Sequence, residues 1–110
     1  MDGLKRPVFA DVAEAGEVAP GEVKAVMADD HSILLLNVEG ELYAFKNVCA
    51  SDGMSLEGGR LTETVLVCPW QNCAYDARSG KRVDDPGQPA LAVVPVRVED
   101  GTVRVAVDAA

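Results

Sequence analysis

The chain has 110 residues, of which 48% are hydrophobic, 5% aromatic and 25% charged. A chain of this size and composition is expected to fold as one domain with an aliphatic core, which excludes the disordered and fibrous classes. Ten Lys and Arg against eighteen Asp and Glu give a net charge of −8. This charge disfavours nucleic acid and anionic membrane surfaces as partners, and it favours a basic protein surface.

The sequence carries no evident targeting signal. The longest apolar stretch without charge, around residues 33–38, is too short to span a bilayer. Residues 1–6 open no apolar region of the kind that a secretory signal peptide needs. We therefore expect a cytoplasmic protein that does not bind membranes.

In chain order, short Val-rich segments alternate with turns rich in Gly, Pro and Asp, and no segment has helical periodicity. Glu39-Gly40 and Asp100-Gly101 are typical of the tight turns that join two hairpin strands. This pattern predicts an all-β sandwich or small barrel, formed as a single domain by residues 1–110. The strands are expected at residues 8–12, 22–27, 32–38, 41–45, 64–67, 75–77, 93–98 and 102–107.

Three cysteines, Cys49, Cys68 and Cys73, lie in two polar loops. The first loop covers residues 49–59 and is rich in glycine, and the second covers residues 68–76. An odd number of cysteines is not typical of a disulfide-stabilised secreted domain. The cysteines therefore indicate metal binding, redox chemistry or buried thiols.

The two loops resemble those of Rieske-type [2Fe–2S] ferredoxins. Cys49 and Cys68 stand at the family's spacing for its two cysteines, and Ser51 and Gln71 stand where the family has its two histidines. The resemblance implies an all-β, Rieske-like antiparallel β-sandwich in which the two loops form a small subdomain at about residues 47–77. Other matching positions are Gly53, Leu56, Gly59, Leu61, Pro69, Trp70, Tyr75, Asp76, Ser79, Gly80 and the closing segment 94–101.

The resemblance raises the question of a cofactor. In a Rieske centre two cysteine thiolates hold one iron and two histidines hold the other. This chain would offer Cys49 and Cys68 to the first iron, but only Ser51 and Gln71 to the second. A hydroxyl and a neutral amide oxygen are poor ligands where thiolate or imidazole is needed. We therefore predict no cofactor and no metal, and the alternative is a [2Fe–2S] cluster with non-standard ligation.

The resemblance also implies that Cys49 and Cys68 converge in the fold. Without iron, two such thiols form either a disulfide or a reduced pair that packs as small hydrophobic groups, so Cys49 and Cys68 are the disulfide candidate. Cys73 is interpreted as a buried thiol. The only histidine, His31, is interpreted as a solvated turn residue rather than a ligand.

Three functions remain open at this point. The first is a cluster-less accessory protein that binds or regulates an oxidoreductase, in particular a reductase or oxygenase subunit. The small subunit of cytoplasmic nitrite reductases, which resembles Rieske domains without their ligands, is a precedent. The second is an electron-transfer ferredoxin that serves an oxygenase system through irregular ligation. The third is a thiol–disulfide redox protein that uses Cys49 and Cys68.

The expected mode of action is binding rather than catalysis. The sequence offers no residue set for nucleophilic or acid–base chemistry near neutral pH, so we do not expect an enzyme. Rieske-type ferredoxins dock partners through the tip of the cluster loops. The resemblance therefore makes Met54 and Trp70 the candidate contacts with a protein partner.

Overall fold

The computed structural model describes residues 7–28, 31–49, 55–69, 73–85 and 87–108. Within these residues the chain forms ten short strands, one short 3-10 helix and no α-helix. Every strand pair is antiparallel, which confirms the predicted fold class. The elements are β1 (Pro7–Glu14), η1 (Ala15–Glu17), β2 (Val23–Ala28), β3 (His31–Val38), β4 (Glu41–Lys46), β5 (Arg60–Thr62), β6 (Val65–Val67), β7 (Ala74–Asp76), β8 (Val93–Val94), β9 (Val96–Glu99) and β10 (Thr102–Asp108).

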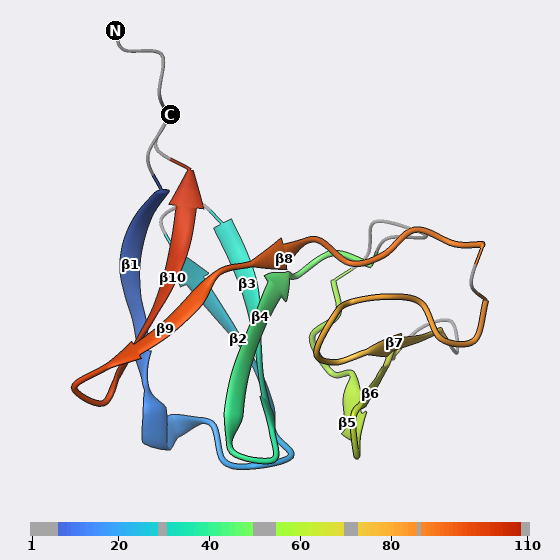
Figure 1. Cartoon of the computed structure of the whole chain (residues 1–110), viewed down its shortest axis with the longest axis horizontal. Helices are drawn as coiled ribbons and strands as arrows, with labels where there is room; N and C mark the ends of the chain where they lie inside the picture. The colour runs from blue at the N-terminus through green and yellow to red at the C-terminus, as the bar shows by residue number, and fades with distance from the viewer. Residues whose placement is uncertain (1–6, 29–30, 50–54, 70–72, 86, 109–110) are drawn as a thin grey trace, which may run out of the picture.

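The strands form three sheets, and Figure 1 shows the sheet that contains β2, β3, β4 and β8 between the other two. The outer sheet has the order β1-β10-β9, the central sheet β2-β3-β4-β8 and the small sheet β5-β6-β7. The outer and central sheets make the sandwich. The small sheet lies on the other side of the central sheet and carries both cysteine-containing loops on its connections.

Strand β3 joins the two cores because both of its faces are buried. Ile33 and Leu35 pack in the core between the central and outer sheets, whereas Leu34 and Leu36 pack in the core shared with the small sheet. Alternate side chains of a strand point to opposite faces, so a continuous apolar run of this kind is typical of a strand covered on both sides. The sandwich and the small sheet are therefore connected through one strand.

Two tight hairpins were predicted, and both are confirmed. Glu39 and Gly40 have φ angles of 54° and 95°, and Asp100 and Gly101 have φ angles of 51° and 79°. Two successive positive φ angles are the signature of the type I′ turn, whose twist matches that of the flanking strands. These turns set the register of β3 with β4 and of β9 with β10.

Two elements differ from the sequence prediction. Residues 93–98 were expected to be one strand, but β8 pairs with β4 and β9 pairs with β10, so the chain changes sheets at Pro95. Proline has no backbone N–H to donate to a ladder, and for this reason it interrupts the strand. Strand β5, which lies just after the glycine-rich loop, was not predicted because Arg60–Thr62 is too short to show a hydrophobic alternation.

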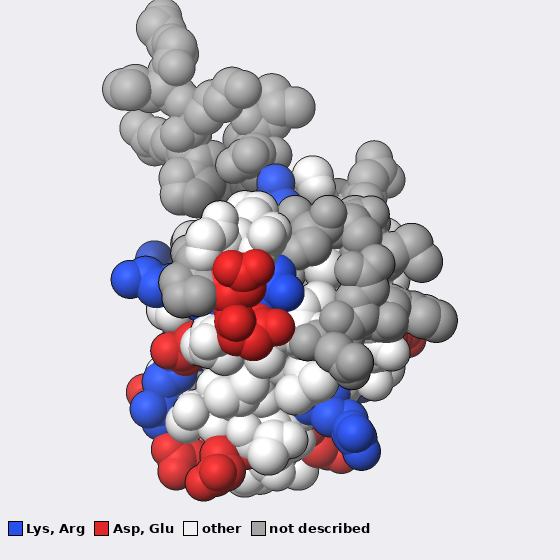
Figure 2. Space-filling view, turned by 90° about the vertical axis from the view of Figure 1, so that its right-hand side faces the viewer, with Lys and Arg blue, Asp and Glu red and all other residues white. Residues whose placement is uncertain are grey.

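The surface at the small-sheet end has mixed charge. Figure 2 shows acidic and basic side chains interspersed with uncharged ones on this face, without a continuous field of one sign among the described residues. The part of the chain that the structure describes has no helix long and apolar enough to cross a membrane.

Candidate functional site

The hairpin formed by β6 and β7 places two of the cysteines opposite each other. Its register pairs Val67 with Ala74, so the next pair toward the loop is Cys68 with Cys73. The Cys68 N–H donates to the Cys73 carbonyl at 2.7 Å, which extends the ladder by one step. Residues directly opposite in an antiparallel pair have their side chains on the same face. Both thiols therefore point into the core beneath the small sheet.

The third cysteine, Cys49, follows β4 and is held in place through Asn47. The Asn47 backbone N–H donates to the Ser32 carbonyl at 3.0 Å, and its Nδ2 donates to Ser32 Oγ at 3.0 Å. Asn47 Oδ1 accepts the N–H of Leu56 at 2.8 Å. These bonds tie the end of β4 to β3 on one side and to the glycine-rich loop on the other. Cys49, which lies between the tied segments, is directed into the same core.

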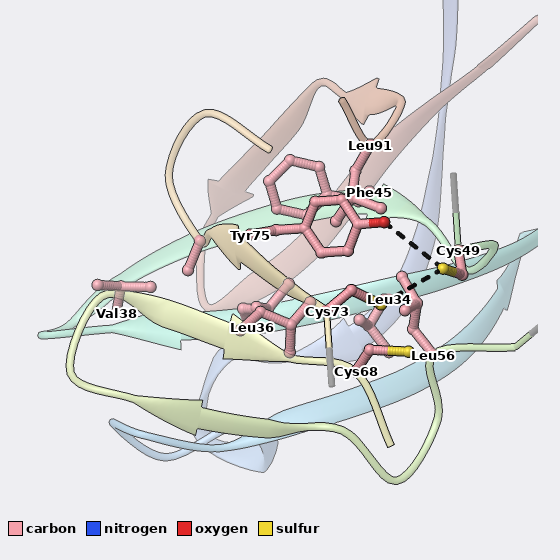
Figure 3. Packing of buried hydrophobic residues seen from close by; sticks show 12 residues of the cluster. Leu34, Leu36, Val38, Phe45, Cys49, Leu56, Cys68, Cys73, Tyr75 and Leu91 are labelled. Atoms are coloured by element: carbon pink, nitrogen blue, oxygen red, sulfur yellow. Dashed lines mark hydrogen bonds between the residues drawn. The ribbon is translucent and has the colours of Figure 1, made fainter. Parts of the chain in front are cut away.

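The three thiols form one compact group. Their sulfur atoms all lie within 4.8 Å of one another, and the distance between Cys49 Sγ and Cys73 Sγ is 3.8 Å. Tyr75 Oη lies 3.5 Å from Cys49 Sγ, within hydrogen-bonding range for sulfur. Figure 3 shows these groups gathered at one end of the hydrophobic cluster, between Tyr75 and Leu56. No disulfide joins these three cysteines in the part of the chain that the structure describes.

Burial controls the chemistry of these thiols. Cys49, Cys68 and Cys73 are 1%, 4% and 1% exposed. Burial, together with hydrogen bonds to the thiols of Cys68 and Cys49, raises the pKa of Cys73 to about 12. A thiol is a nucleophile and a ligand only as its thiolate. In the absence of a bound cation, Cys73 is therefore a neutral and unreactive group at physiological pH.

The glycine-rich loop passes very close to β6. A Cβ atom on Gly59 would lie 2.9 Å from the Val67 carbonyl oxygen and 3.0 Å from that of Leu56. Only glycine allows two backbone segments to approach in this way. The approach closes the core over Leu66, which packs with the cysteines.

An ion pair in the segment after β7 contacts this strand. Arg82 pairs with Asp84, and its guanidinium lies over the Tyr75 ring at 5.5 Å from the centroid. Asp84 Oδ1 also accepts the N–H of Ala74 at 3.2 Å. The ion pair with Arg82, aided by this backbone hydrogen bond, lowers the pKa of Asp84 against the opposing effect of burial. The segment after β7 thus holds Tyr75 against the thiol group.

The structure brings together Cys49 and Cys68, as the family resemblance implied, and places Cys73 in the same group. Cys73 is buried, in agreement with its interpretation as a buried thiol, but its contact with Cys49 was not predicted. Reading residues 65–76 as a hairpin would have placed Cys73 opposite Cys68. The other predicted site residues, Ser51, Met54, Trp70 and Gln71, lie outside the described residues.

His31 is exposed at the first position of β3, rather than in a turn. Its backbone pairs with Ala28, at the end of the β2–β3 ladder. Among the described residues, the group that could hold a metal ion consists of the three cysteines alone. His31 is therefore not a member of the site.

Comparison with known families identifies the architecture. The Rieske [2Fe–2S] domain matches residues 8–95. The chain belongs to this family. The sandwich of outer and central sheets, with the small sheet bearing the two cysteine loops, is thus the Rieske fold that the sequence predicted.

Several relatives are named as ferredoxins of oxygenase systems. The chain is 34% identical over 98 residues to the biphenyl dioxygenase ferredoxin subunit of Pseudomonas sp. strain KKS102, covering 88% of this chain and 90% of that protein. It is 29% identical to the ferredoxin component of the alkene monooxygenase system of Xanthobacter autotrophicus, covering 88% and 80%. Among solved structures, the Sphingomonas yanoikuyae B1 ferredoxin superposes with a TM-score of 0.82 at 26% identity, covering 91% and 99%.

The family carries a [2Fe–2S] cluster, and this chain lacks both histidines of the family's ligand set. A Rieske cluster needs two imidazoles on its outer iron. The chain has one histidine, His31, which is at neither ligand position. The positions are occupied by Ser51 and Gln71, whose oxygen donors are unsuited to an iron–sulfur cluster. The third thiol, Cys73, is at neither histidine position, and its sulfur lies 3.8 Å from Cys49 Sγ in the apolar core.

Proposed function

We propose that this Rieske-family protein is a cluster-less accessory protein, which acts by binding or regulating an oxidoreductase partner. The observation that carries the proposal is the donor set: two family cysteines are kept, and both histidine positions are changed to Ser51 and Gln71. The fold that presents the two loops is retained without the ligands for a cluster. If this fold presents the two loops but carries out no redox chemistry, the function that remains for the loops is to bind a partner.

The proposed partner is a reductase or an oxygenase subunit. Several relatives are named as ferredoxin components of oxygenase systems. A ferredoxin similar to this chain, at 27% identity and a TM-score of 0.82, is described in a complex with the oxygenase of carbazole 1,9a-dioxygenase. We extend that mode of binding to this chain and place the contact at Met54 and Trp70. The proposal includes a cytoplasmic location and no catalytic activity of its own.

The test of the lost cluster is an analysis of iron and acid-labile sulfide. Protein produced with ample iron and sulfide should be colourless and should contain neither. A matched variant, Ser51→His with Gln71→His, restores the imidazoles, and we expect it to gain visible absorption. About two irons and two sulfides per wild-type chain would contradict the proposal.

A second candidate function is electron transfer by a [2Fe–2S] cluster with non-standard ligation. The names of the relatives favour it, because they are ferredoxins of oxygenase systems. The same analysis decides between the two functions. A coloured wild-type protein that accepts one electron reversibly would establish electron transfer and exclude the accessory role without a cluster.

A third candidate function is thiol–disulfide redox chemistry through Cys49 and Cys68, whose sulfur atoms lie within 4.8 Å. Oxidised protein, denatured without reductant, should then show one titratable thiol rather than three. A cross-link between these loops should stabilise the fold by up to about 3 kcal/mol, reduced by any strain. Because Cys73 Sγ also lies close to Cys49 Sγ, at 3.8 Å, peptide mapping must establish which pair is joined.

A further inference from the structure

We propose that Cys49, Cys68 and Cys73 together form a binding site for one thiophilic divalent cation, and that Zn²⁺ is the ion that fits best. The site differs from a Rieske centre because Cys73 is not at one of that family's ligand positions. The inference goes beyond the proposed function and rests on it only in that the cysteines must be free of an iron–sulfur cluster.

The spacing of the three sulfur atoms suits a tetrahedral zinc ion. A Zn–S bond of about 2.3 Å in a tetrahedral site separates two thiolate sulfurs by about 3.8 Å. The distance between Cys49 Sγ and Cys73 Sγ is 3.8 Å. Because all three sulfurs lie within 4.8 Å of one another, the other two separations need to shorten by about 1 Å at most. Small side-chain rotations are sufficient for that change.

Hydrogen bonds of the backbone and of Asn47 hold the three ligands in place before any ion binds. Cys68 and Cys73 are locked opposite each other by the hydrogen bond from the Cys68 N–H to the Cys73 carbonyl. Cys49 is held by the bonds of Asn47 to Ser32 and Leu56. The site is thus made by two parts of the chain that are distant in sequence, and the ion would cross-link them.

The chemistry of the three thiolates determines which ion fits the site. Thiolates are soft ligands that select zinc, copper(I) or iron–sulfur clusters over magnesium and calcium. The three cysteines are buried in an apolar core, where net charge is unfavourable. A divalent ion neutralises two of the three thiolate charges, whereas a monovalent ion neutralises one. Three protein ligands leave one tetrahedral position for water, as in many zinc sites.

The experiment is a metal titration of reduced, iron-free, full-length protein. Zn²⁺ binding is measured by calorimetry, and Co²⁺ is used as a spectroscopic probe because its thiolate complexes have a charge-transfer absorption. We expect one ion per chain and a thiolate-to-cobalt band. Failure of the folded wild-type protein to bind either ion would overturn the inference.

Two variants locate the site. Cys73→Ser keeps both family cysteines, and we expect at least about tenfold weaker Zn²⁺ binding and loss of most of the cobalt band. His31→Ala removes the only histidine, an exposed residue, and should bind as the wild type does. Unchanged binding by Cys73→Ser, or loss of binding in His31→Ala, would overturn the inference. Circular dichroism establishes whether each variant is folded. If Cys73→Ser does not fold, Cys49→Ser and Cys68→Ser are tested in its place.

The two proposals fail in different measurements. Iron and acid-labile sulfide in the isolated protein would contradict the cluster-less function. The absence of a thiolate-to-cobalt band in iron-free protein would contradict the zinc site. Failure to bind an oxidoreductase partner would contradict the proposed function and would leave the proposed zinc site standing.

Discussion

At the scale of single residues, Asn47 connects two segments of the chain through its buried side chain. It is 6% exposed, and its side chain bonds to Ser32 and to Leu56, which lie on different segments. A buried polar group that loses its partner costs about 1–3 kcal/mol. Replacing Asn47 would leave the Leu56 N–H without this acceptor, and the glycine-rich loop would lose its link to β3 and β4.

We predict that Asn47→Ala lowers the free energy of unfolding by about 1–3 kcal/mol. Chemical denaturation followed by circular dichroism measures the change. The neighbouring Val48 is 47% exposed, so Val48→Ala is the matched control and should stay within about 0.5 kcal/mol of the wild type. Equal stability of the two variants would show that the Asn47 bonds do not stabilise the fold.

Gly80 gives a second prediction at this scale. Its φ angle is +80°, and a Cβ atom there would lie 2.9 Å from Phe45 Cε1 and 3.1 Å from the Leu91 carbonyl oxygen. Gly21 has a similar φ angle of +87°, but a Cβ atom at that position would meet nothing within 4 Å. Both alanine variants incur the left-handed backbone strain of about 1–2 kcal/mol. Only Gly80→Ala adds overpacking, of about 1–3 kcal/mol.

We therefore expect the thermal midpoint of Gly80→Ala to fall further than that of Gly21→Ala. Differential scanning calorimetry of the two variants isolates the packing effect because the backbone strain is shared. If Gly21→Ala is the less stable of the two, the close contact of Gly80 with Phe45 is not a constraint on this fold.

At the scale of elements, the sequence predicted most strands because their turns are chemically specific. Glu39-Gly40 and Asp100-Gly101 have the residues that a type I′ turn requires, and the apolar run of β3 is long enough to be recognised. The change of sheet at Pro95 was missed because an apolar alternation does not show which neighbour a strand pairs with. That choice depends on tertiary packing.

The site was predictable only in part for a related reason. Cys49 and Cys68 were expected to meet because a family resemblance supplied the three-dimensional arrangement. The contact between Cys73 and Cys49 depends on the register of β6 with β7 and on the path of the chain after β4. Single-residue patterns do not encode such a distance, although the β6–β7 hairpin implies the pairing of Cys68 with Cys73.

The contact between β7 and the following segment gives a pH prediction. Arg82 lowers the pKa of Asp84 in the folded protein below its unfolded value. A group whose folded pKa is depressed stabilises the protein above the unfolded pKa, and this stabilisation is lost as pH falls through the folded pKa. Asp84 therefore contributes to stability near neutral pH, and its contribution disappears in acid, below about pH 4.

We expect Asp84→Asn to be less stable than the wild type at neutral pH and to lose less stability on acidification. Urea denaturation at a series of pH values measures both effects. Glu41→Gln, at the exposed start of β4, is the control and should follow the wild-type pH dependence. If the free energy of unfolding has the same pH dependence in Asp84→Asn as in the wild type, the ion pair with Arg82 does not contribute to the pH dependence of stability.

At the scale of the whole molecule, β3 couples the two cores. Leu34 and Leu35 are adjacent, both are 0% exposed, and they point into different cores. Loss of either core would expose one face of the strand on which the other core depends. This coupling supports the proposal that residues 1–110 form a single cooperative domain.

We predict that Leu34→Ala and Leu35→Ala each lower the stability of one common unfolding transition, by about 2–5 kcal/mol. Coincident curves from far-ultraviolet circular dichroism and near-ultraviolet absorbance would establish the single transition. Two transitions, with Leu34→Ala shifting only one of them, would divide the chain into a sandwich and an independent small sheet.

The net charge of −8 bears on how the whole molecule meets its partner. Surface charges are screened over about 8 Å at physiological ionic strength, so attraction to a basic subunit should weaken as salt is added. The mixed charges on the small-sheet face make this salt effect modest there. The proposed apolar contact at Met54 and Trp70 must therefore determine how slowly the complex dissociates. Charge should therefore affect the association rate, and the aromatic contact the dissociation rate.

We predict that binding to the oxidoreductase subunit isolated with the protein from its native source becomes weaker between low and high salt. Trp70→Ala should raise the dissociation rate by about 30-fold, since loss of a buried aromatic contact costs about 2 kcal/mol. Val98→Ala removes an apolar side chain that is 49% exposed on β9 of the outer sheet, and it should leave both rates unchanged. Surface plasmon resonance at two ionic strengths measures all three proteins. Truncating a side chain changes the dissociation rate only where the partner buries that side chain. If Val98→Ala changes the dissociation rate and Trp70→Ala does not, the interface lies on the outer sheet and not on the cysteine loops.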